Sequence, residues 1–258
     1  MDSTDRIVSL PAIERAHQLA VHCLHLRCLG AICGPPGVGK TVSLRSIEAK
    51  FPTFGVPGSV VYYRAFHADG YTRGVRDLLT GLGIRSSQIP MGASLQLVGK
   101  VALREFRSQN IRLLLIDEAD SWTLDSLRGL VSVIDAANQA DLPISAVFAG
   151  GSDLPRWLNQ HAAGFSRTLQ IDHFQNLPLD LTLAVLRQWG SPFESLTERI
   201  TQKEKDARLL GKRILQATGG NLRRLNFFAR LFLTHYPEGP VNGDEVEAIF
   251  TQMLTASE

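Results

Sequence analysis

Apolar and polar residues follow two different periodic patterns along the first 150 residues. Short apolar runs of strand length alternate with longer segments in which apolar residues recur every three to four positions, as on one face of a helix. Strands that alternate with helices in this way indicate an α/β domain with a largely parallel sheet. The apolar runs predict strands over residues 29–33, 60–65, 112–116 and 144–149, and the helical spacing predicts helices over residues 10–27, 40–50, 73–82, 95–108 and 123–138.

The pattern changes after Gly151, where strand-like runs give way to helical periodicity that continues towards the C-terminus. Proline and glycine residues interrupt this helical part at several points. We therefore expect two domains, an α/β core over residues 1–177 and a small helical domain over residues 178–258. The helices of the second domain are predicted over residues 178–190, 193–217, 221–235 and 242–255.

The composition is that of an ordinary globular protein, with 44% hydrophobic and 20% charged residues, which argues against a disordered chain. The net charge is +2 over 258 residues, so a nucleic-acid partner would have to use a local basic patch. The three cysteines, Cys23, Cys28 and Cys33, fit neither a disulfide framework nor a zinc site. Neither a signal-type segment nor an apolar run of roughly 18–20 residues is visible, so we expect a cytoplasmic protein without a membrane partner.

The strongest chemical signal is a loop between the first predicted strand and the next helix, which matches G-x-x-x-x-G-K-[ST] in full. Its glycines let several backbone N–H groups face one anion, and the helix start adds a positive dipole end. Lys40 is expected to reach the β- and γ-phosphates, and the Thr41 hydroxyl to bind Mg²⁺. The residues expected at the nucleotide are Gly34, Pro35, Pro36, Gly37, Val38, Gly39, Lys40, Thr41 and Val42.

Two carboxylates follow the third predicted strand, whose apolar residues 113–116 are typical of a buried central strand. The carboxyl ends of such strands form the crevice where ligands bind. Asp117 is expected to hold Mg²⁺ directly or through water, and Glu118 to orient and activate the attacking water. The loop and the acid pair together predict an ATPase that uses ATP and Mg²⁺, in which hydrolysis can require an arginine from elsewhere.

The phosphate loop Gly34–Thr41, the acidic run Ile116–Asp120 and the helical C-terminal part together resemble the AAA+ ATPases. More narrowly, they resemble the transposition regulators of the MuB, TnsC and TniB group, in which an Asp-Glu-Ala-Asp motif is typical. The resemblance covers roughly residues 10–235. It implies a P-loop AAA+ core, with a parallel sheet flanked by helices, and a small C-terminal helical lid domain.

Three further site residues are implied by this resemblance. Ser152 falls where AAA+ proteins place the sensor of the γ-phosphate or the attacking water. Arg167 lies in the stretch that supplies an arginine finger to a neighbouring subunit, with Arg156 as the alternative. Arg223 matches the sensor in the lid domain that contacts the nucleotide, whereas Arg224 could instead bind DNA or a partner.

The resemblance also implies ATP-driven assembly into a helical filament or a ring on duplex DNA, through backbone contacts with little sequence dependence. The region over residues 60–112 carries eight basic and three acidic residues, a local net charge of +5. Arginine and hydroxyl groups are the usual ligands of the DNA backbone, although a basic helix face can also be merely solvated. The candidate DNA contacts are Thr72, Arg73, Arg76, Lys100 and Arg104.

The resemblance therefore implies a homo-oligomeric DNA-binding ATPase that selects target DNA and recruits and stimulates a transposase, with a targeting protein as a further partner. Two alternatives stay open, a helicase-loader or initiator ATPase and an ExeA-like secretion ATPase. The secretion type should carry a membrane span and a peptidoglycan-binding segment, and neither is visible. A third interpretation, a scaffold that binds ATP without turnover, is disfavoured by intact Lys40, Asp117 and Glu118.

Overall fold

The structure is a computed structural model that divides into two compact units. The α/β unit comprises Pro11–Pro35 and Lys40–Phe174, and the helical unit is built on Gln175–Glu258 and includes Pro36–Gly39. The residues that the structure describes are 10–85, 89, 92–162 and 169–255.

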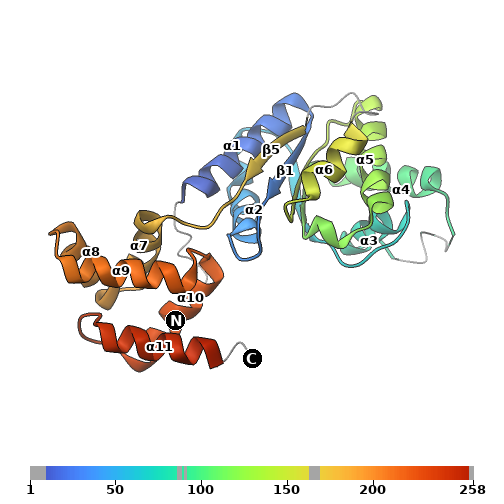
Figure 1. Cartoon of the computed structure of the whole chain (residues 1–258). Coiled ribbons are helices and arrows are strands. Elements are labelled where there is room, and N and C mark those ends of the chain that lie inside the picture. The colour runs from blue at the N-terminus through green and yellow to red at the C-terminus, as the bar shows by residue number, and fades with distance from the viewer. Residues whose placement is uncertain (1–9, 86–88, 90–91, 163–168, 256–258) are drawn as a thin grey trace. The chain divides into compact units, whose positions relative to one another are not determined.

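The α/β unit contains one sheet, whose strands are β1 (Leu29–Cys33), β2 (Ser59–Arg64), β3 (Ile111–Asp117), β4 (Ser145–Gly150) and β5 (Leu169–His173). All neighbouring strands are parallel, and their order is β2-β3-β4-β1-β5. The three central strands are almost fully buried, which explains why they read as continuous apolar runs in the sequence. The fold is therefore the predicted α/β class with a parallel sheet (Figure 1).

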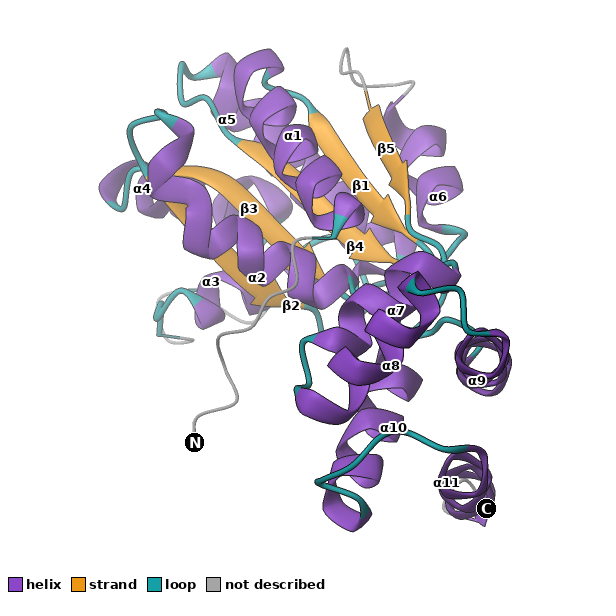
Figure 2. Ribbon diagram, turned by 90° about the vertical axis from the view of Figure 1, so that its left-hand side faces the viewer, coloured by secondary structure: helices purple, strands orange, loops and turns teal. Residues whose placement is uncertain are grey.

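Helices cover both faces of this sheet (Figure 2). One face is covered by α1 (Pro11–Leu26) and α2 (Lys40–Lys50). The other face is covered by α3 (Arg73–Gly81), α4 (Leu95–Ser108), α5 (Leu124–Gln139) and α6 (Leu154–Ala162). Two short 3₁₀ helices, η1 (Phe51–Phe54) and η3 (Ala119–Ser121), follow α2 and β3.

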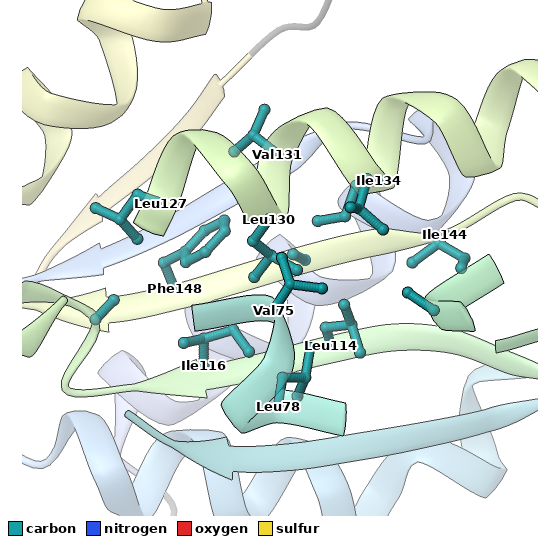
Figure 3. Packing of buried hydrophobic residues seen from close by; sticks show 14 of the residues in the cluster. Val75, Leu78, Leu114, Ile116, Leu127, Leu130, Val131, Ile134, Ile144 and Phe148 are labelled. Carbon is teal, nitrogen blue, oxygen red and sulfur yellow. The ribbon is translucent and has the colours of Figure 1, made fainter. Parts of the chain in front are cut away.

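The core of the α/β unit forms where α5 packs on β3 and β4. The apolar residues of α5 recur at helical spacing, so they form one stripe that faces the sheet. Leu130 and Ile134 are fully buried, and Figure 3 shows Leu130 beside Phe148 of β4 and Ile134 further along α5 towards Ile144, the residue before β4. Each such side chain stabilises the fold by about 1.5–3 kcal/mol. This packing fixes the strands whose carboxyl ends carry the candidate site.

Side-chain caps mark where two of these helices begin. The Thr123 hydroxyl oxygen accepts a hydrogen bond from the Ser126 N–H at the start of α5, and Ser94 does the same for Leu97 at the start of α4. A cap of this kind is worth about 1 kcal/mol, because it satisfies one of the free N–H groups at a helix start.

The helical unit contains α7 (Leu179–Arg187), α8 (Ser191–Thr201), α9 (Lys205–Thr218), α10 (Leu222–His235) and α11 (Gly243–Thr255). Its core includes the buried rings of Phe193, Phe228 and Phe232, whose centroids lie 5.3–6.2 Å apart. These are favourable distances for tilted aromatic pairs. Within the residues described above, no helix is both long enough and apolar enough to cross a bilayer.

Three elements differ from the prediction. The structure adds β5 and α6, which the apolar pattern did not indicate. The single helix predicted over residues 193–217 is wrong, because α8 ends at Thr201 and α9 begins at Lys205. Between them Lys203 takes a left-handed conformation, with φ of 65°. The break falls in a run of polar residues, where apolar spacing carries no information.

Candidate functional site

The candidate site lies at the carboxyl edge of the sheet, where the register aligns the strand ends. Cys33 of β1 pairs with Gly150 of β4, and the Gly34 N–H donates to the Gly150 carbonyl oxygen at 3.3 Å. β3 ends next to β4 and carries Asp117 as its last residue. The phosphate loop, the acid pair and the residues after β4 therefore start from adjacent strands, as expected for a ligand crevice in such a sheet.

The glycines of the phosphate loop have backbone conformations that other residues rarely adopt. Gly37 and Gly39 have φ values of 82° and 104°. At Gly34 a Cβ atom would overlap the carbonyl oxygen of Phe174, so the loop needs a residue without a side chain there. The sequence pattern of the loop is thus matched by its geometry.

Lys40 begins α2, and its ammonium group is folded back over its own loop. The Nζ atom donates to the carbonyl oxygens of Gly34 at 2.6 Å and Pro35 at 2.9 Å. Burial lowers the pKa of the Lys40 amine, and the carboxylates of Asp120 and Asp117 act in the opposite direction. The Lys40 cation is therefore held on the phosphate loop and is influenced electrostatically by the acidic motif.

Asp117 is buried at 2% exposure, and both its carboxylate oxygens are engaged. Oδ1 accepts a hydrogen bond from the Glu118 N–H at 3.0 Å, and Oδ2 accepts one from the Tyr62 hydroxyl at 2.7 Å. Burial, followed by the hydrogen bond to Asp117, raises the pKa of the Tyr62 phenol. The carboxylate is therefore held in one orientation at the end of β3.

Glu118 differs from Asp117 in both exposure and backbone conformation. It takes a left-handed conformation, with φ of 52°, and its side chain is 46% exposed. One carboxylate oxygen, Oε1, accepts from the Arg64 guanidinium at 2.5 Å. Arg64 is the last residue of β2 and pairs in register with Asp117. An attacking water would have to share Glu118 with this arginine.

Asp120 joins the acidic motif to the segment after β4. Its Oδ2 atom accepts a hydrogen bond from the Gly151 N–H at 2.9 Å. A Cβ atom at Gly150 or Gly151 would lie 3.0 Å from the Asp120 carboxylate, which leaves little room for a side chain. Ser152, the predicted sensor, is exposed two residues beyond the end of β4. The main chain of Gly151, rather than the Ser152 hydroxyl, makes this link to the acidic motif.

In the helical unit, Asn221 caps α10 and contacts the loop segment that belongs to the same unit. Its Oδ1 atom accepts from the Arg223 and Arg224 N–H groups at 3.1 and 3.3 Å. Its Nδ2 atom donates to the Pro36 carbonyl oxygen at 2.8 Å. The Arg223 N–H donates to the Gly37 carbonyl oxygen at 3.2 Å. Arg223, predicted to contact the nucleotide, therefore reaches this segment through its main chain, and its guanidinium is exposed.

The other predicted residues belong to α3, α4 and α6, directly precede α3, or lie outside the described part of the chain. Thr72 precedes α3, and Arg73 and Arg76 lie in its first turn. Lys100 and Arg104 lie on α4, where both are exposed and Arg104 pairs with Glu105 at 3.0 Å. Arg167 lies outside the described residues, and its alternative Arg156 is an exposed residue of α6.

The donor set at the strand ends suits a magnesium ion bound together with a nucleotide. Across the described residues, no three or more His, Cys, Asp or Glu side chains gather as in a metal centre. The site instead offers the buried Asp117 carboxylate and the exposed Thr41 hydroxyl in the first turn of α2. Mg²⁺ commonly takes one or two protein oxygens and completes its shell with water and phosphate oxygens. The residues present therefore fit this ion.

Sequence reasoning misses the contacts that β2 makes with the acid pair. It gives Tyr62 no role and counts Arg64 only with the basic residues of the region over residues 60–112. Both lie near the carboxyl end of β2, which pairs with β3. The feature that would identify them as site residues is therefore their position beside Asp117 and Glu118. That signal becomes readable only when the strand order is known.

Comparisons with known proteins agree with this geometry. A family model described as AAA domain matches residues 25–158. The chain is similar to the structure of the Aeropyrum pernix Orc1 protein in complex with DNA, at a TM-score of 0.60 and 17% identity over 95% of this chain and 66% of that one. It is also similar to domain III of the Thermotoga maritima replication initiation protein DnaA, at a TM-score of 0.57 and 15% identity over 95% of this chain and 93% of that one. A third similar structure is Cdc6p from Pyrobaculum aerophilum, at a TM-score of 0.53 and 15% identity over 97% of this chain and 88% of that one. A comparison with curated proteins gave no significant match.

Proposed function

Because the chain belongs to the AAA domain family, we propose that it is a Mg²⁺-dependent ATPase that assembles on duplex DNA in its ATP-bound state. More narrowly, we propose that it selects target DNA and recruits and stimulates a transposase, with a targeting protein as a further partner. The arrangement of Lys40, Asp117 and Glu118 at the carboxyl edge of one parallel sheet carries the proposal of ATP hydrolysis.

The proposed roles follow from the chemistry of each group. Lys40 and the N–H groups of the glycine loop bind the phosphates, and Thr41 and Asp117 hold Mg²⁺. Bound there, Mg²⁺ would supply positive charge that neutralises the negative charge developing during phosphoryl transfer. Glu118 accepts a proton from the attacking water once its carboxylate is free of Arg64. Ser152 of the same subunit and Arg167 of a neighbouring subunit complete the proposed catalytic set.

DNA binding is proposed from charge on α3 and α4. Arg73, Lys100 and Arg104 are exposed on these helices, in the region whose local net charge is +5. Such residues suit the phosphate backbone, which is recognised mainly by basic and hydroxyl groups. The Orc1 protein with a similar fold was solved in complex with DNA, which supports a nucleic-acid role without placing the contact.

The transposition role rests on the Asp-Glu-Ala-Asp motif at residues 117–120 and on the resemblance that it carries. In the proposed switch, ATP at a subunit interface favours the assembled state and hydrolysis releases it. ATP must bind the assembled state more tightly than the free subunit, because an equal affinity would shift nothing. Each subunit then needs few DNA contacts, since assembly multiplies them.

A replication-initiator or helicase-loader role is the second candidate. The observation that favours it is the likeness in fold to DnaA domain III and to Cdc6p. Both candidates share ATP and DNA as ligands and differ in the assembly that they form. An initiator or loader should form small rings or short oligomers, whereas the transposition regulator should coat DNA.

Electron microscopy of the purified protein with duplex DNA tests this proposal. We would compare ATP, a slowly hydrolysed analogue and ADP, with Lys40→Ala as the binding-deficient variant. Helical filaments that coat DNA with the triphosphates and vanish with ADP or Lys40→Ala are the expected result. Closed rings, or monomers indifferent to DNA, would contradict the transposition role and favour the initiator or loader candidate.

A further inference from the structure

Tyr62 lies on the face of β2 that leads to the acidic motif. Successive side chains of a strand point to opposite faces, so Tyr62 and Tyr63 are separated by the sheet. Tyr62 pairs in register with Leu115, and Asp117 is its diagonal neighbour two residues further along β3. Long side chains reach such diagonal neighbours. The Tyr62 hydroxyl does so here and donates to the Asp117 Oδ2 atom at 2.7 Å.

The ring of Tyr62 is itself held by a residue of α2. The guanidinium carbon of Arg45 lies 3.4 Å from the ring centroid, which is a close cation–π contact. Arg45 also pairs with Glu48 at 2.8 Å, which fixes the guanidinium on the same helix. The contact of Arg45 with Tyr62 therefore joins α2 to the end of β3.

This chain of contacts links the two protein groups that fit Mg²⁺. Thr41 lies on α2, one turn before Arg45, and Asp117 ends β3. Without the Tyr62 hydroxyl, the Asp117 carboxylate would keep the local hydrogen bond from the Glu118 N–H, which comes from the adjacent residue. A carboxylate offers about four lone-pair positions, so two remain for other ligands when both bonds are made. The second bond decides which way these two positions face.

We propose that Tyr62 is a positioning residue that orients the Asp117 carboxylate towards the Mg²⁺–nucleotide complex. This inference rests on the proposed function, because it assumes that Mg²⁺ and a nucleotide bind at the strand ends. It assigns a role in the site to a residue of β2, a strand that belongs to neither the phosphate loop nor the acidic motif. Arg45 supports the role by holding the ring of Tyr62 from α2.

The chain offers a matched control in the next residue. Tyr63 lies on the opposite face of β2, where its ring packs near Trp122 with a centroid distance of 6.0 Å. Tyr62→Phe and Tyr63→Phe each remove one phenolic oxygen from the same strand and keep the ring. They differ in whether that oxygen touches Asp117. A general weakening of β2 would therefore affect both variants alike.

The experiment measures binding of a fluorescent ATP analogue while Mg²⁺ is titrated, and again in EDTA. For Tyr62→Phe we expect the Mg²⁺ concentration at half-maximal binding to rise about tenfold, as for loss of a hydrogen bond to a charged group. Binding in EDTA should be unchanged, and Tyr63→Phe should match the wild type. Arg45→Met should shift the Mg²⁺ midpoint in the same direction by roughly two- to fivefold, as for loss of an exposed cation–π contact.

Several results would overturn the inference. A Tyr62→Phe protein that melts at a lower temperature but keeps the wild-type Mg²⁺ midpoint would show that the hydroxyl only stabilises the fold. An equal shift in Tyr63→Phe would show a general effect of β2. A wild type that binds no nucleotide with or without Mg²⁺ would contradict the proposed function and this inference with it. Wild-type binding with an unshifted Tyr62→Phe contradicts this inference alone.

Discussion

The acidic end of β3 and the basic outer surface of α3 and α4 are built in opposite ways. At the end of β3, Asp117, Glu118 and Asp120 each have a partner from another element, namely Tyr62, Arg64 and Gly151. On α3 and α4 the candidate DNA contacts Arg73 and Lys100 are exposed side chains of single helices. Chemistry on a phosphate requires groups held in one geometry, whereas recognition of a charged backbone tolerates flexible ones. The comparison therefore separates a fixed site from an adaptable surface.

The largest effect should come from the fixed site, with Glu118→Gln. This change keeps the size of the side chain and removes its ability to accept a proton. We expect ATP turnover to fall by about 10²- to 10⁴-fold, which is the usual contribution of a general base, while nucleotide binding is retained. Phosphate release and binding of a fluorescent analogue would be measured together. A variant that keeps its turnover would assign the base to another residue.

Lys40→Ala should reduce binding itself. Its ammonium group lies over the phosphate loop, and hydrogen bonds to charged groups are worth about 1.5–3 kcal/mol. We therefore expect nucleotide affinity to fall roughly 10- to 100-fold, measured by the same fluorescence titration. Lys50→Ala, at the other end of α2, is the matched control and should bind as the wild type does. Equal losses in both variants would indicate a general effect on the helix.

The adaptable surface should respond to charge and salt rather than to geometry. In the double variant Arg73→Gln with Lys100→Gln we expect weaker DNA binding and a shallower dependence on salt. The slope of log affinity against log salt should fall by about 0.9 for each phosphate that the variant no longer neutralises. Lys205→Gln with Arg208→Gln on α9 removes the same charge from the helical unit and should leave the slope unchanged. If the α9 variant lowered the slope and the variant on α3 and α4 did not, the DNA-binding surface would lie on the helical unit.

Arg64→Gln should have the smallest effect and sharpens the comparison most directly. The ion pair with Glu118 is exposed on both sides, and such pairs are worth about 0.2–1 kcal/mol. Releasing Glu118 from Arg64 should therefore raise ATP turnover only about two- to fivefold, with nucleotide affinity unchanged. Steady-state turnover at saturating ATP checks this. A fall in turnover would mean that Arg64 takes part in catalysis instead of restraining Glu118.

The sequence is most informative where one physical demand decides the residues. The phosphate loop needs positive φ values and close backbone approach, so its glycines can be recognised without a structure. The buried strands β1, β3 and β4 are visible because sheets covered on both faces are continuously apolar. The less buried strand β5 lacks such a run and escapes prediction.

The remaining contacts of the site depend on which strands become neighbours. Tyr62 and Arg64 are ordinary strand residues in the sequence, and they meet Asp117 and Glu118 only because β2 pairs with β3. The break at Lys203 escapes prediction for another reason, since polar residues continue a helical register as readily as they interrupt it. Long-range pairing and short polar breaks are thus the two kinds of information that local patterns do not supply.

The left-handed backbone conformation of Glu118 lowers the stability of the fold at a residue that the proposed ATP turnover needs. A residue other than glycine or asparagine held in this conformation costs of order 1–2 kcal/mol. Asparagine adopts it more readily, so Glu118→Asn is expected to give a protein at least as resistant to thermal unfolding and unable to turn over ATP. Selection for thermal stability alone would therefore tend to remove this glutamate. A need for ATP turnover would explain why it is present despite the loss of stability.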